Sequence, residues 1–288
     1  MNALDELIAL LDLAPLEVNL FRGVSWKDDR PRVFGGQVAG QALVAAGRTV
    51  DPEQKCHSLH AYFLRPGDPT IPIIYEVDRI RDGRSFTTRR VVAIQRGEAI
   101  FNLQASFHRA EEGFDHQVEM PEVPDPETLP RADEIEPPRP GRLWDRQPGD
   151  MRYVTGPPWD REVSPEARQL VWIRADGTLP DDPLLHTCVV AYASDYTLLG
   201  SSLVPHGVTY FGDDVMMASL DHAMWFHRPF RADEWLLYSQ MSPSASGARG
   251  LAYGGIFRRD GTLVVSVVQE GLIRPIRDPS RLTHFYRS

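Results

Sequence analysis

One carboxylate lies where a charge is unexpected. Asp195 follows the run Val189–Ser194, in which apolar and small residues predict a helix. A carboxylate in such surroundings is unfavourable unless it is hydrogen-bonded or has a function. One interpretation is a satisfied core acid, or an acid that caps a nearby backbone group. The other is a partly desolvated carboxylate whose raised basicity lets it orient and deprotonate a water molecule.

Two uncharged polar residues are candidates to assist such a carboxylate. Gln269 follows the largely apolar run Val264–Val268, which is typical of a strand. A glutamine there is usually exposed or paired with the backbone, but as a site residue its amide can donate to one oxygen and accept from a water. Ser219 has the weakest signal of its own, because serine at a strand start is common.

Signatures of several other enzyme chemistries are absent from the sequence. There is no Gly-x-Ser-x-Gly motif, which argues against a serine hydrolase of the α/β type. There is no phosphate-binding Gly-x-x-x-x-Gly-Lys-Ser/Thr loop, and no Gly-x-Gly-x-x-Gly follows a strand. His222 and His227 lack the spacing of a His-Glu-x-x-His zinc motif, so these two and His60 are interpreted as packing residues. We predict neither a metal site nor a cofactor.

Composition and charge narrow the class of protein. The 288 residues are 42% hydrophobic and 25% charged, which is ordinary for a globular chain and excludes disorder. The formal net charge of −9 argues against broad nucleic-acid binding. No apolar stretch approaches the roughly 18 residues that a membrane span requires.

The cysteines and the N-terminus indicate a compartment. Cys56 and Cys188 are the only cysteines, too few for a disulfide framework or a zinc ribbon, and each lies in an apolar run typical of a buried thiol. The first 25 residues carry several acids and no basic segment of the kind that opens a signal peptide. We therefore expect a cytoplasmic protein.

A proline-rich segment divides the chain into halves. Of the 24 prolines, 11 fall in residues 121–165, and residues 119–150 carry nine acids and four arginines. Such a stretch cannot form a regular helix or a central strand, so it predicts an extended surface linker. We expect a first domain over 1–118 with an N-terminal helix, an acidic linker over 119–150, and a second domain over 151–288.

The halves repeat each other faintly. Tyr62–Pro66 matches Trp225–Pro229 at an offset of 163, whereas two turn glycines, Gly83 and Gly97, match Gly247 and Gly261 at an offset of 164. Three landmarks at a nearly constant offset predict two tandem copies of one fold.

In each copy the sequence predicts one long helix followed by four antiparallel strands. The first has a short strand over Val18–Trp26, a small-residue helix over Gly35–Val50 that can lie close to a sheet, and a stripe of leucines near the N-terminus for an outer helix. The second has a strand over Gln169–Arg174 and a helix through Leu184–Leu199 that Asp182 and Pro183 begin. The other predicted strands are Ser58–Arg65, Ile71–Arg81, Ser85–Ile94, Glu98–His108, Val215–Phe226, Glu234–Met241, Leu251–Phe257 and Leu263–Ile273. A helix wrapped by a curved antiparallel sheet is a hotdog, so the fold class is α+β, a double hotdog.

Long motifs resemble those of the acyl-CoA thioesterase II (TesB-type) family over about residues 20–275. The segments that carry this resemblance are Phe34–Ala42, Ser58–Gly67, Arg81–Phe86, Ala193–Asp195, Ser219–Pro229 and Gln269–Arg274. The resemblance implies a double hotdog that hydrolyses acyl-CoA to a free acid and coenzyme A.

The resemblance also implies a catalytic set. An aspartate on the second helix, a hydroxyl residue that opens a strand and a glutamine on the last strand fall on Asp195, Ser219 and Gln269; serine replaces the threonine of other relatives but supplies the same hydroxyl. Asp221, two residues beyond Ser219 in the predicted strand, is expected on the same face as Ser219. The first copy is interpreted as a degenerate site. Its Gly36 and Gln37, together with Arg249, are candidate substrate-binding residues.

Two other functions remain as alternatives, and an assembly is expected. A non-catalytic acyl-CoA-binding protein could keep the same fold, although all three polar groups are present. A double-hotdog enoyl-CoA hydratase would need a histidine a few residues after its aspartate, and Tyr196–Gly200 contains none. Because hotdog sheets leave edges and faces that commonly pair and relatives form oligomers, we expect a homodimer or homotetramer whose partner molecule is acyl-CoA.

Overall fold

The N-terminus forms a capped helix and a small hairpin. The computed structural model describes residues 2–26, 31–135, 148–159, 163–208 and 214–276. Helix α1 (Ala3–Leu11) begins with a capping box between Asn2 and Asp5, and it buries its leucines as the stripe predicted. Instead of one strand over Val18–Trp26, the chain forms β1 (Ala14–Glu17) and β2 (Leu20–Gly23), because it reverses at residues 18–19.

The first repeat has the predicted order of one helix and four strands. Helix α2 (Gly35–Gly47) is followed by four long strands, and it ends three residues before the predicted Val50. These strands are β3 (Gln54–Phe63), β4 (Ile73–Asp82), β5 (Phe86–Gln95) and β6 (Glu98–Arg109).

The second repeat follows the same order with two differences. Helix α4 (Pro183–Ser194) ends well before Leu199, and a 3₁₀ helix over Leu199–His206 follows it. The predicted strand Val215–Phe226 is two strands that break at Leu220. The strands of this repeat are β7 (Gly149–Tyr153), β8 (Arg168–Ala175), β9 (Val215–Ser219), β10 (Asp221–Phe226), β11 (Leu236–Ser246), β12 (Arg249–Arg258) and β13 (Leu263–Pro275).

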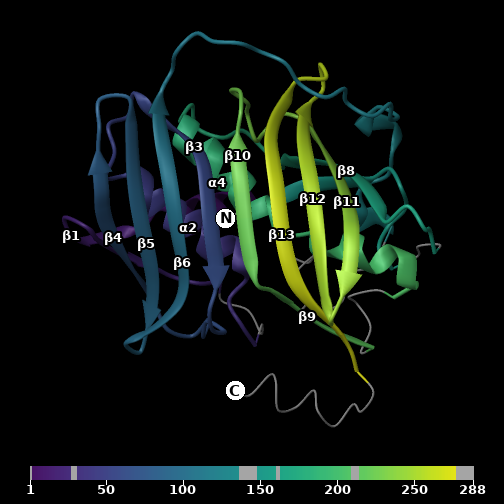
Figure 1. The fold of residues 1–288 in the computed structure, drawn as a ribbon, viewed down its shortest axis with the longest axis horizontal. Coiled ribbons are helices and arrows are strands. Elements are labelled where there is room, and N and C mark those ends of the chain that lie inside the picture. Colours follow the sequence, from purple (N-terminus) through teal and green to yellow (C-terminus); the bar gives the residue numbers. More distant parts are fainter. Residues whose placement is uncertain (1, 27–30, 136–147, 160–162, 209–213, 277–288) are drawn as a thin grey trace.

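The two repeats share one antiparallel sheet. In the described residues this sheet has 13 strands: one path follows the order β1-β2-β4-β5-β6-β3-β10-β13-β12-β11-β8-β7, and β9 lies off this path, paired with β13. The repeats join where β3 pairs with β10, with Leu59 opposite Met224 (Figure 1). This is the double hotdog predicted from the sequence.

The strand register gives the repeat a residue-by-residue correspondence. Tyr75 pairs with Ala93 in the first repeat, and Tyr238 pairs with Ile256 in the second, so both partners differ by 163. Cys56 pairs with Phe107, and Ser219 pairs with Gly271, which gives offsets of 163 and 164. The faint sequence repeat is therefore also a structural repeat.

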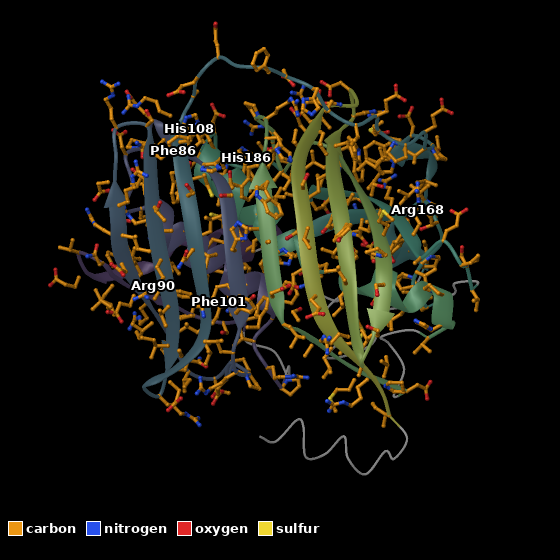
Figure 2. The ribbon with its side chains drawn as sticks, viewed as in Figure 1. Phe86, Arg90, Phe101, His108, Arg168 and His186 are labelled. Atoms are coloured by element: carbon orange, nitrogen blue, oxygen red, sulfur yellow. The ribbon has the colours of Figure 1, made fainter. Side chains whose placement is uncertain are left out.

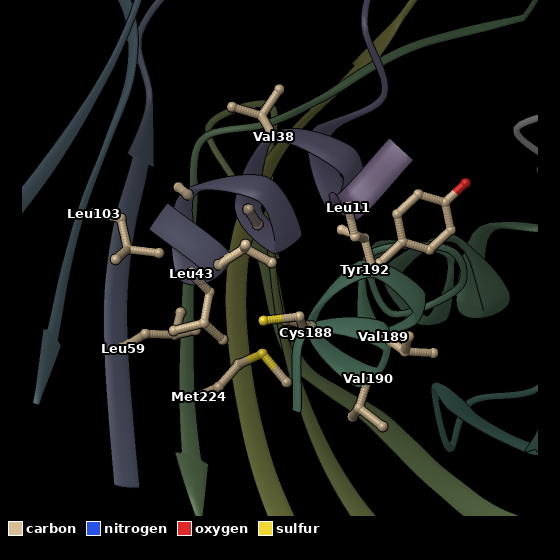
Figure 3. Close-up of a cluster of buried hydrophobic side chains, with 14 of the residues drawn as sticks. Leu11, Val38, Leu43, Leu59, Leu103, Cys188, Val189, Val190, Tyr192 and Met224 are labelled. Atoms are coloured by element: carbon tan, nitrogen blue, oxygen red, sulfur yellow. The ribbon is translucent and has the colours of Figure 1, made fainter. Parts of the chain in front are cut away.

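The helices α2 and α4 pack together behind the sheet. Small residues of α2 allow this close approach: a Cβ on Gly40 would lie 3.2 Å from the carbonyl oxygen of Cys188, and a Cβ on Gly47 would lie 2.6 Å from Leu184. Figure 3 shows Leu43, Leu59 and other apolar side chains meeting between the two helices and the sheet. The N-terminus of each helix therefore lies beside the C-terminus of the other.

The segment between the repeats contacts the part of the sheet that belongs to the second repeat. It contains a 3₁₀ turn over Pro126–Thr128 and a short helix, α3 (Ala132–Ile135). Trp172 donates its indole N–H to the carbonyl of Pro124, and Arg259 pairs with Asp125 and Glu127. The predicted linker also includes residues 136–147, which lie outside the described residues, and it ends inside β7.

None of the helices in the described ranges combines the length and hydropathy that crossing a bilayer needs.

Candidate active site

Asp195 caps the C-terminus of α4 and does not lie inside the helix. Its backbone is near-helical (φ −84°, ψ −4°), and its N–H bonds to the carbonyl of Ala193. The prediction that it is a helix-interior residue was wrong, because the chain leaves the helical path after Ser194. A residue at a helix end can direct its side chain beyond the helix axis, towards a neighbouring element.

The structure brings the three predicted catalytic residues together on one oxygen. Gln269 Nε2 donates to Asp195 Oδ1 at 2.6 Å, and Ser219 Oγ donates to the same oxygen at 3.0 Å. Gln269 comes from the middle of β13 and is fully buried, whereas Ser219 is the last residue of β9 and is half-buried. Ser219 thus ends a strand, whereas the predicted strand Val215–Phe226 contained it and the family resemblance implied a residue that opens a strand.

The N-terminus of α2 completes the surroundings of this carboxylate. The backbone N–H of Gly36 donates to Asp195. The N-cap residue of α2, Phe34, has no side-chain oxygen to satisfy the first N–H groups, so the carboxylate from the other repeat takes that role. The partial positive charge of a helix N-terminus also favours an anion there.

Two adjacent glycines permit this approach. A Cβ on Gly35 would lie 2.6 Å from Asp195 Oδ2 and 2.8 Å from the ring of Phe63. A Cβ on Gly36 would clash with the carbonyl oxygen of Tyr192 and with the ring of Phe34. The first turn of α2 therefore accommodates the carboxylate because it lacks side chains.

Burial makes Asp195 an unusually basic carboxylate. It raises the pKa of Asp195 from 3.8 to about 6, while the hydrogen bonds from Gln269, Ser219 and Gly36 oppose part of that rise. Near neutral pH the group is ionised, yet it is a much stronger base than an exposed aspartate. This is the property that a carboxylate general base requires.

Gln269 keeps one unused hydrogen-bonding group. Its Nε2 binds Asp195, and its Oε1 is buried with no protein partner among the described residues. A buried amide oxygen without a partner is unfavourable. The site therefore retains an acceptor beside the carboxylate, where a polar reactant can bind.

The other predicted site residues have different surroundings. Gln37 is 1% exposed, and its amide donates to Ser25 Oγ (2.9 Å) and to the carbonyl of Val24 (3.3 Å). Arg249 is half-exposed at the start of β12, where its Nε bonds to Glu270 at 2.9 Å. Of the three substrate-binding candidates, only Gly36 is in contact with Asp195.

The sequence predicted that Asp221 would share a strand with Ser219, and this prediction was wrong: Ser219 ends β9 and Asp221 begins β10. The register of the chain against β13 shifts by one residue between Ser219, which faces Gly271, and Ala223, which faces Val268. Such a bulge re-aims the side chains that follow it. Asp221 accepts a hydrogen bond from the backbone N–H of Glu270 at 2.6 Å.

The equivalent place in the first repeat lacks all three groups. Helix α2 has Arg48 at its C-cap, Cys56 occupies the place of Ser219, and Ala105 occupies the place of Gln269. The buried Arg89 adjoins this place and bonds to Thr49. These residues support the interpretation of the first copy as degenerate.

Sequence reasoning missed the role of Gly35 and of the residues that hold the α4 terminus. His222 was interpreted as a packing residue; it is fully buried, burial lowers its pKa to about 4, and its Nε2 lies 2.8 Å from Ser194 Oγ. Comparison of the two repeats would have marked it, because the equivalent residue is Leu59. In the described part of the chain, no group of three His, Cys, Asp or Glu side chains could hold a metal ion.

An apolar recess adjoins the site along α4. Tyr192, Ala193 and Tyr196, which flank Asp195 in the sequence, form one wall of it. Residues of β7, β8 and β11, together with Leu7 of α1, also line it. Phe34 packs on both tyrosines at the end nearest Gly35, with ring centroids 5.2 and 4.7 Å apart.

Comparison with known proteins now adds to this geometry. Residues 145–272 match the family described as acyl-CoA thioesterase, and residues 24–108 match the acyl-CoA thioesterase N-terminal domain. The chain is 44% identical over 283 residues to acyl-coenzyme A thioesterase 8 of Rattus norvegicus, covering 92% of this chain and 88% of the relative. The chain belongs to the acyl-CoA thioesterase II family.

Solved structures agree with this assignment. The acyl-CoA thioesterase II TesB2 of Mycobacterium marinum is 49% identical, with a TM-score of 0.79, covering 94% of this chain and 99% of that one. A hot dog protein of unknown function from Alicyclobacillus acidocaldarius is 21% identical with a TM-score of 0.78, covering 93% of this chain and 98% of that one, and shows the fold alone. This member of the thioesterase II family is thus an acyl-CoA thioesterase, which supersedes the non-catalytic and hydratase alternatives.

Proposed function

We propose that this thioesterase hydrolyses acyl-CoA by direct attack of a water molecule that Asp195 activates. The observation that carries the proposal is the convergence of Gln269 and Ser219 on one oxygen of a half-buried carboxylate whose pKa is about 6. The second carboxylate oxygen and the unpartnered Oε1 of Gln269 are then the acceptors that hold the water.

The reaction proceeds in two steps, the formation of a tetrahedral intermediate and its collapse. Asp195 takes one proton from the water as the water oxygen forms a bond to the thioester carbonyl carbon, which gives a tetrahedral oxyanion and a protonated Asp195. The oxyanion then collapses and the carbon–sulfur bond breaks, so the acid and coenzyme A leave. Because a thiol has a pKa of about 8.5, the sulfur departs readily and takes up the proton from Asp195, and no histidine is needed.

The apolar recess beside α4 supports an acyl substrate. Its lining includes Ala193, two residues before Asp195, and Tyr196, the residue after it, and its walls are largely hydrocarbon. An acyl chain buried there gains from the removal of apolar surface from water. We assign this recess to the part of the acyl chain nearest the thioester.

The pH dependence of thiol release tests the function and the base together. The group acts only when ionised, so with a panel of acyl-CoAs kcat/KM should be half-maximal near pH 6 and level above pH 7. A free-thiol assay from pH 4.5 to 8.5 measures this.

Asp221 supplies the control for that profile. Burial raises the pKa of Asp221 as well, yet its carboxylate bonds to a backbone N–H and not to Ser219 or Gln269. Asp221→Asn should therefore keep the acidic limb near pH 6. A limb near pH 4 in the unaltered protein, or one that vanishes in Asp221→Asn, would show that Asp195 is not the base.

We also propose that the chain forms a homodimer or homotetramer. The sheet face opposite the helices presents Phe86 stacked on His108, with centroids 4.3 Å apart (Figure 2), and exposes Tyr62 and Tyr253. Exposed aromatic side chains on a sheet face favour association. Light scattering at micromolar concentration should give two or four times 32.5 kDa, and a 32.5 kDa species alone would refute the proposal.

The compartment that we propose is the cytoplasm. Cys56 and Cys188 are both buried and unpaired, as expected of a protein in a reducing environment. Fractionation of cells that produce the tagged protein tests this.

A further inference from the structure

Buried polar side chains from three strands hold the turn that carries Asp195. They bind the residue before it, Ser194, and a residue just after it, Thr197. Both are 2% exposed or less, and so are the residues that bind them: Gln169 of β8, His222 of β10, and Tyr238 and Gln240 of β11. Asp195 therefore lies between two anchored residues.

The first anchor is at Ser194. The hydroxyl of Tyr238 donates to the Ser194 carbonyl at 3.2 Å, which satisfies one of the carbonyls left over at the end of α4. The Ser194 hydroxyl lies 3.0 Å from the carbonyl of Ala191 and 3.5 Å from Met224 Sδ, both of which can accept its proton, and 2.8 Å from His222 Nε2. Burial lowers the pKa of His222 to about 4, so the imidazole that makes this contact is neutral.

The second anchor is at Thr197. Gln240 Nε2 donates to Thr197 Oγ1 at 2.5 Å, and Gln240 Oε1 accepts from Gln169 Nε2 at 2.9 Å. Gln169 also lies 3.5 Å from the carbonyl of Thr197. Two amides from adjacent strands thus fix the turn on the far side of Asp195.

The first repeat shows that the fold does not require this network. His222 corresponds to Leu59, and Gln240 corresponds to Val77, by the registers that pair His60 with Gln104 and Val77 with Val91. Leu59 and Val77 are buried apolar residues. Polar groups occupy these positions only in the repeat that has the carboxylate, and burying polar groups is unfavourable compared with apolar packing.

The equivalent tyrosines Tyr75 and Tyr238 also differ between the repeats in their hydrogen-bond partners. They are equivalent and equally buried, but Tyr75 donates to Gln41 Oε1, on the side chain of a residue in the middle of α2. Tyr238 donates instead to the residue that precedes Asp195. The same residue type at the same place in the fold thus has a different partner in each repeat.

We infer that Tyr238, His222 and Gln240 are positioning residues that hold the Asp195 carboxylate in the geometry of water attack. The inference rests on the proposed function, since it needs Asp195 to be the base. They do not reach the reacting atoms; they act by fixing Ser194 and Thr197. A displacement of about 1 Å at a reacting group can lower the rate about 10²-fold, so small movements of this turn matter.

Tyr238→Phe tests the inference, with Tyr75→Phe as the matched control. Each variant removes one buried hydroxyl from equivalent places, so both should lose similar stability. We expect Tyr238→Phe to lower kcat about 10-fold with KM unchanged, because the turn carries the base and not the substrate site. Tyr75→Phe should change neither constant by more than twofold.

The pH profile and a double variant separate positioning from a general loss of structure. A looser turn weakens the hydrogen bonds to a still-sheltered carboxylate, so the acidic limb of Tyr238→Phe should move above pH 6. The neighbours His222 and Tyr238 do not titrate there, because burial lowers the pKa of the first to about 4 and raises that of the second. Asp221, whose pKa is also raised, is excluded by the Asp221→Asn control.

Tyr238→Phe should have less than a twofold effect in an Asp195→Asn background, because the group that it positions is already lost. Any of three results would overturn the inference. The first is an equal loss of kcat in Tyr238→Phe and Tyr75→Phe, and the second is an acidic limb of Tyr238→Phe that stays near pH 6. The third is a double variant in which the losses of kcat are additive. If Asp195→Asn alone retains most of the activity, the proposed function fails instead. His222→Leu, which installs the residue of the first repeat, should repeat the kcat loss with little loss of stability and guards against misfolding of Tyr238→Phe.

Discussion

Asp195→Asn should lower kcat by about 10²–10⁴-fold while the protein stays folded. The asparagine keeps the size of the side chain and one oxygen that can accept from Gln269 and Ser219, but it cannot take a proton from water. The free-thiol assay at saturating acyl-CoA measures kcat, and circular dichroism checks the fold. Retention of more than half of the activity would contradict the mechanism.

The same variant should be more stable than the unaltered protein at neutral pH. Burial raises the folded-state pKa of Asp195 to about 6, above the ordinary 3.8, so the folded state loses stability as pH rises from 4 through 6. Removing the charge should therefore raise the free energy of unfolding by about 1–3 kcal/mol at pH 8, after allowance for partial exposure, and by little at pH 4. Urea unfolding at the two pH values measures the difference. Equal free energies of unfolding of the variant and the unaltered protein at pH 8 would show that burial does not destabilise the charged carboxylate.

Gln269→Ala should lower kcat by about 10²-fold. The substitution removes the 2.6 Å hydrogen bond to Asp195 Oδ1 and also the buried Oε1, the acceptor that we assign to the water. Steady-state kinetics across a series of acyl-CoAs measures the effect, which should be independent of chain length. A rise in KM with unchanged kcat would instead show that Gln269 only binds substrate.

Ser219→Ala is the companion to this test. Its hydroxyl is half-buried and 3.0 Å from Asp195, so solvent can partly replace it, and the loss should be smaller than that of Gln269→Ala. The variant also distinguishes two chemistries. A covalent acyl group trapped on Ser219 would refute direct attack by water.

Much of the fold could be predicted from the sequence because it lies in local patterns. The offset of 163–164 between Tyr62 and Trp225, and between the turn glycines, is also the offset of the strand registers. Alternating apolar residues and turn glycines located β4, β5 and β6 within two residues of their observed bounds. Such patterns come from burial on one side of a sheet, which a sequence records directly.

The details of the site were less predictable because they depend on backbone irregularities. Ser194 and Asp195 continue a helical pattern, so the end of α4 gives no local signal. The bulge between Ser219 and Ala223 likewise has no sequence signature, yet it separates Ser219 from Asp221. An equivalent shift lies in β3 between Cys56 and Ser58, so the irregularity is common to both repeats.

The candidate substrate contacts show the limit of resemblance. Gln37 lies beside the residues that approach Asp195, but its buried amide fixes α2 to Val24 and Ser25. The part of that motif that contacts Asp195 is the backbone of Gly35 and Gly36, and reasoning from side-chain chemistry does not reveal a contact made by the backbone. Only the contact between the two helices reveals it.

The contact of Asp195 with the first turn of α2 makes the two halves of the chain interdependent. A symmetric pair of identical hotdogs would place a carboxylate at each of two helix junctions and so hold two centres. Here the second half supplies the carboxylate and the amide of the proposed site, and the first half supplies the first turn of α2, which has no side chains at Gly35 and Gly36. At the other junction of the two helices, the C-cap residue is Arg48 and not an aspartate. Joining the halves in one polypeptide fixes their ratio at one to one, which frees each to specialise. In the described part of the chain there is therefore one proposed catalytic site, and we expect that neither half expressed alone can assemble it.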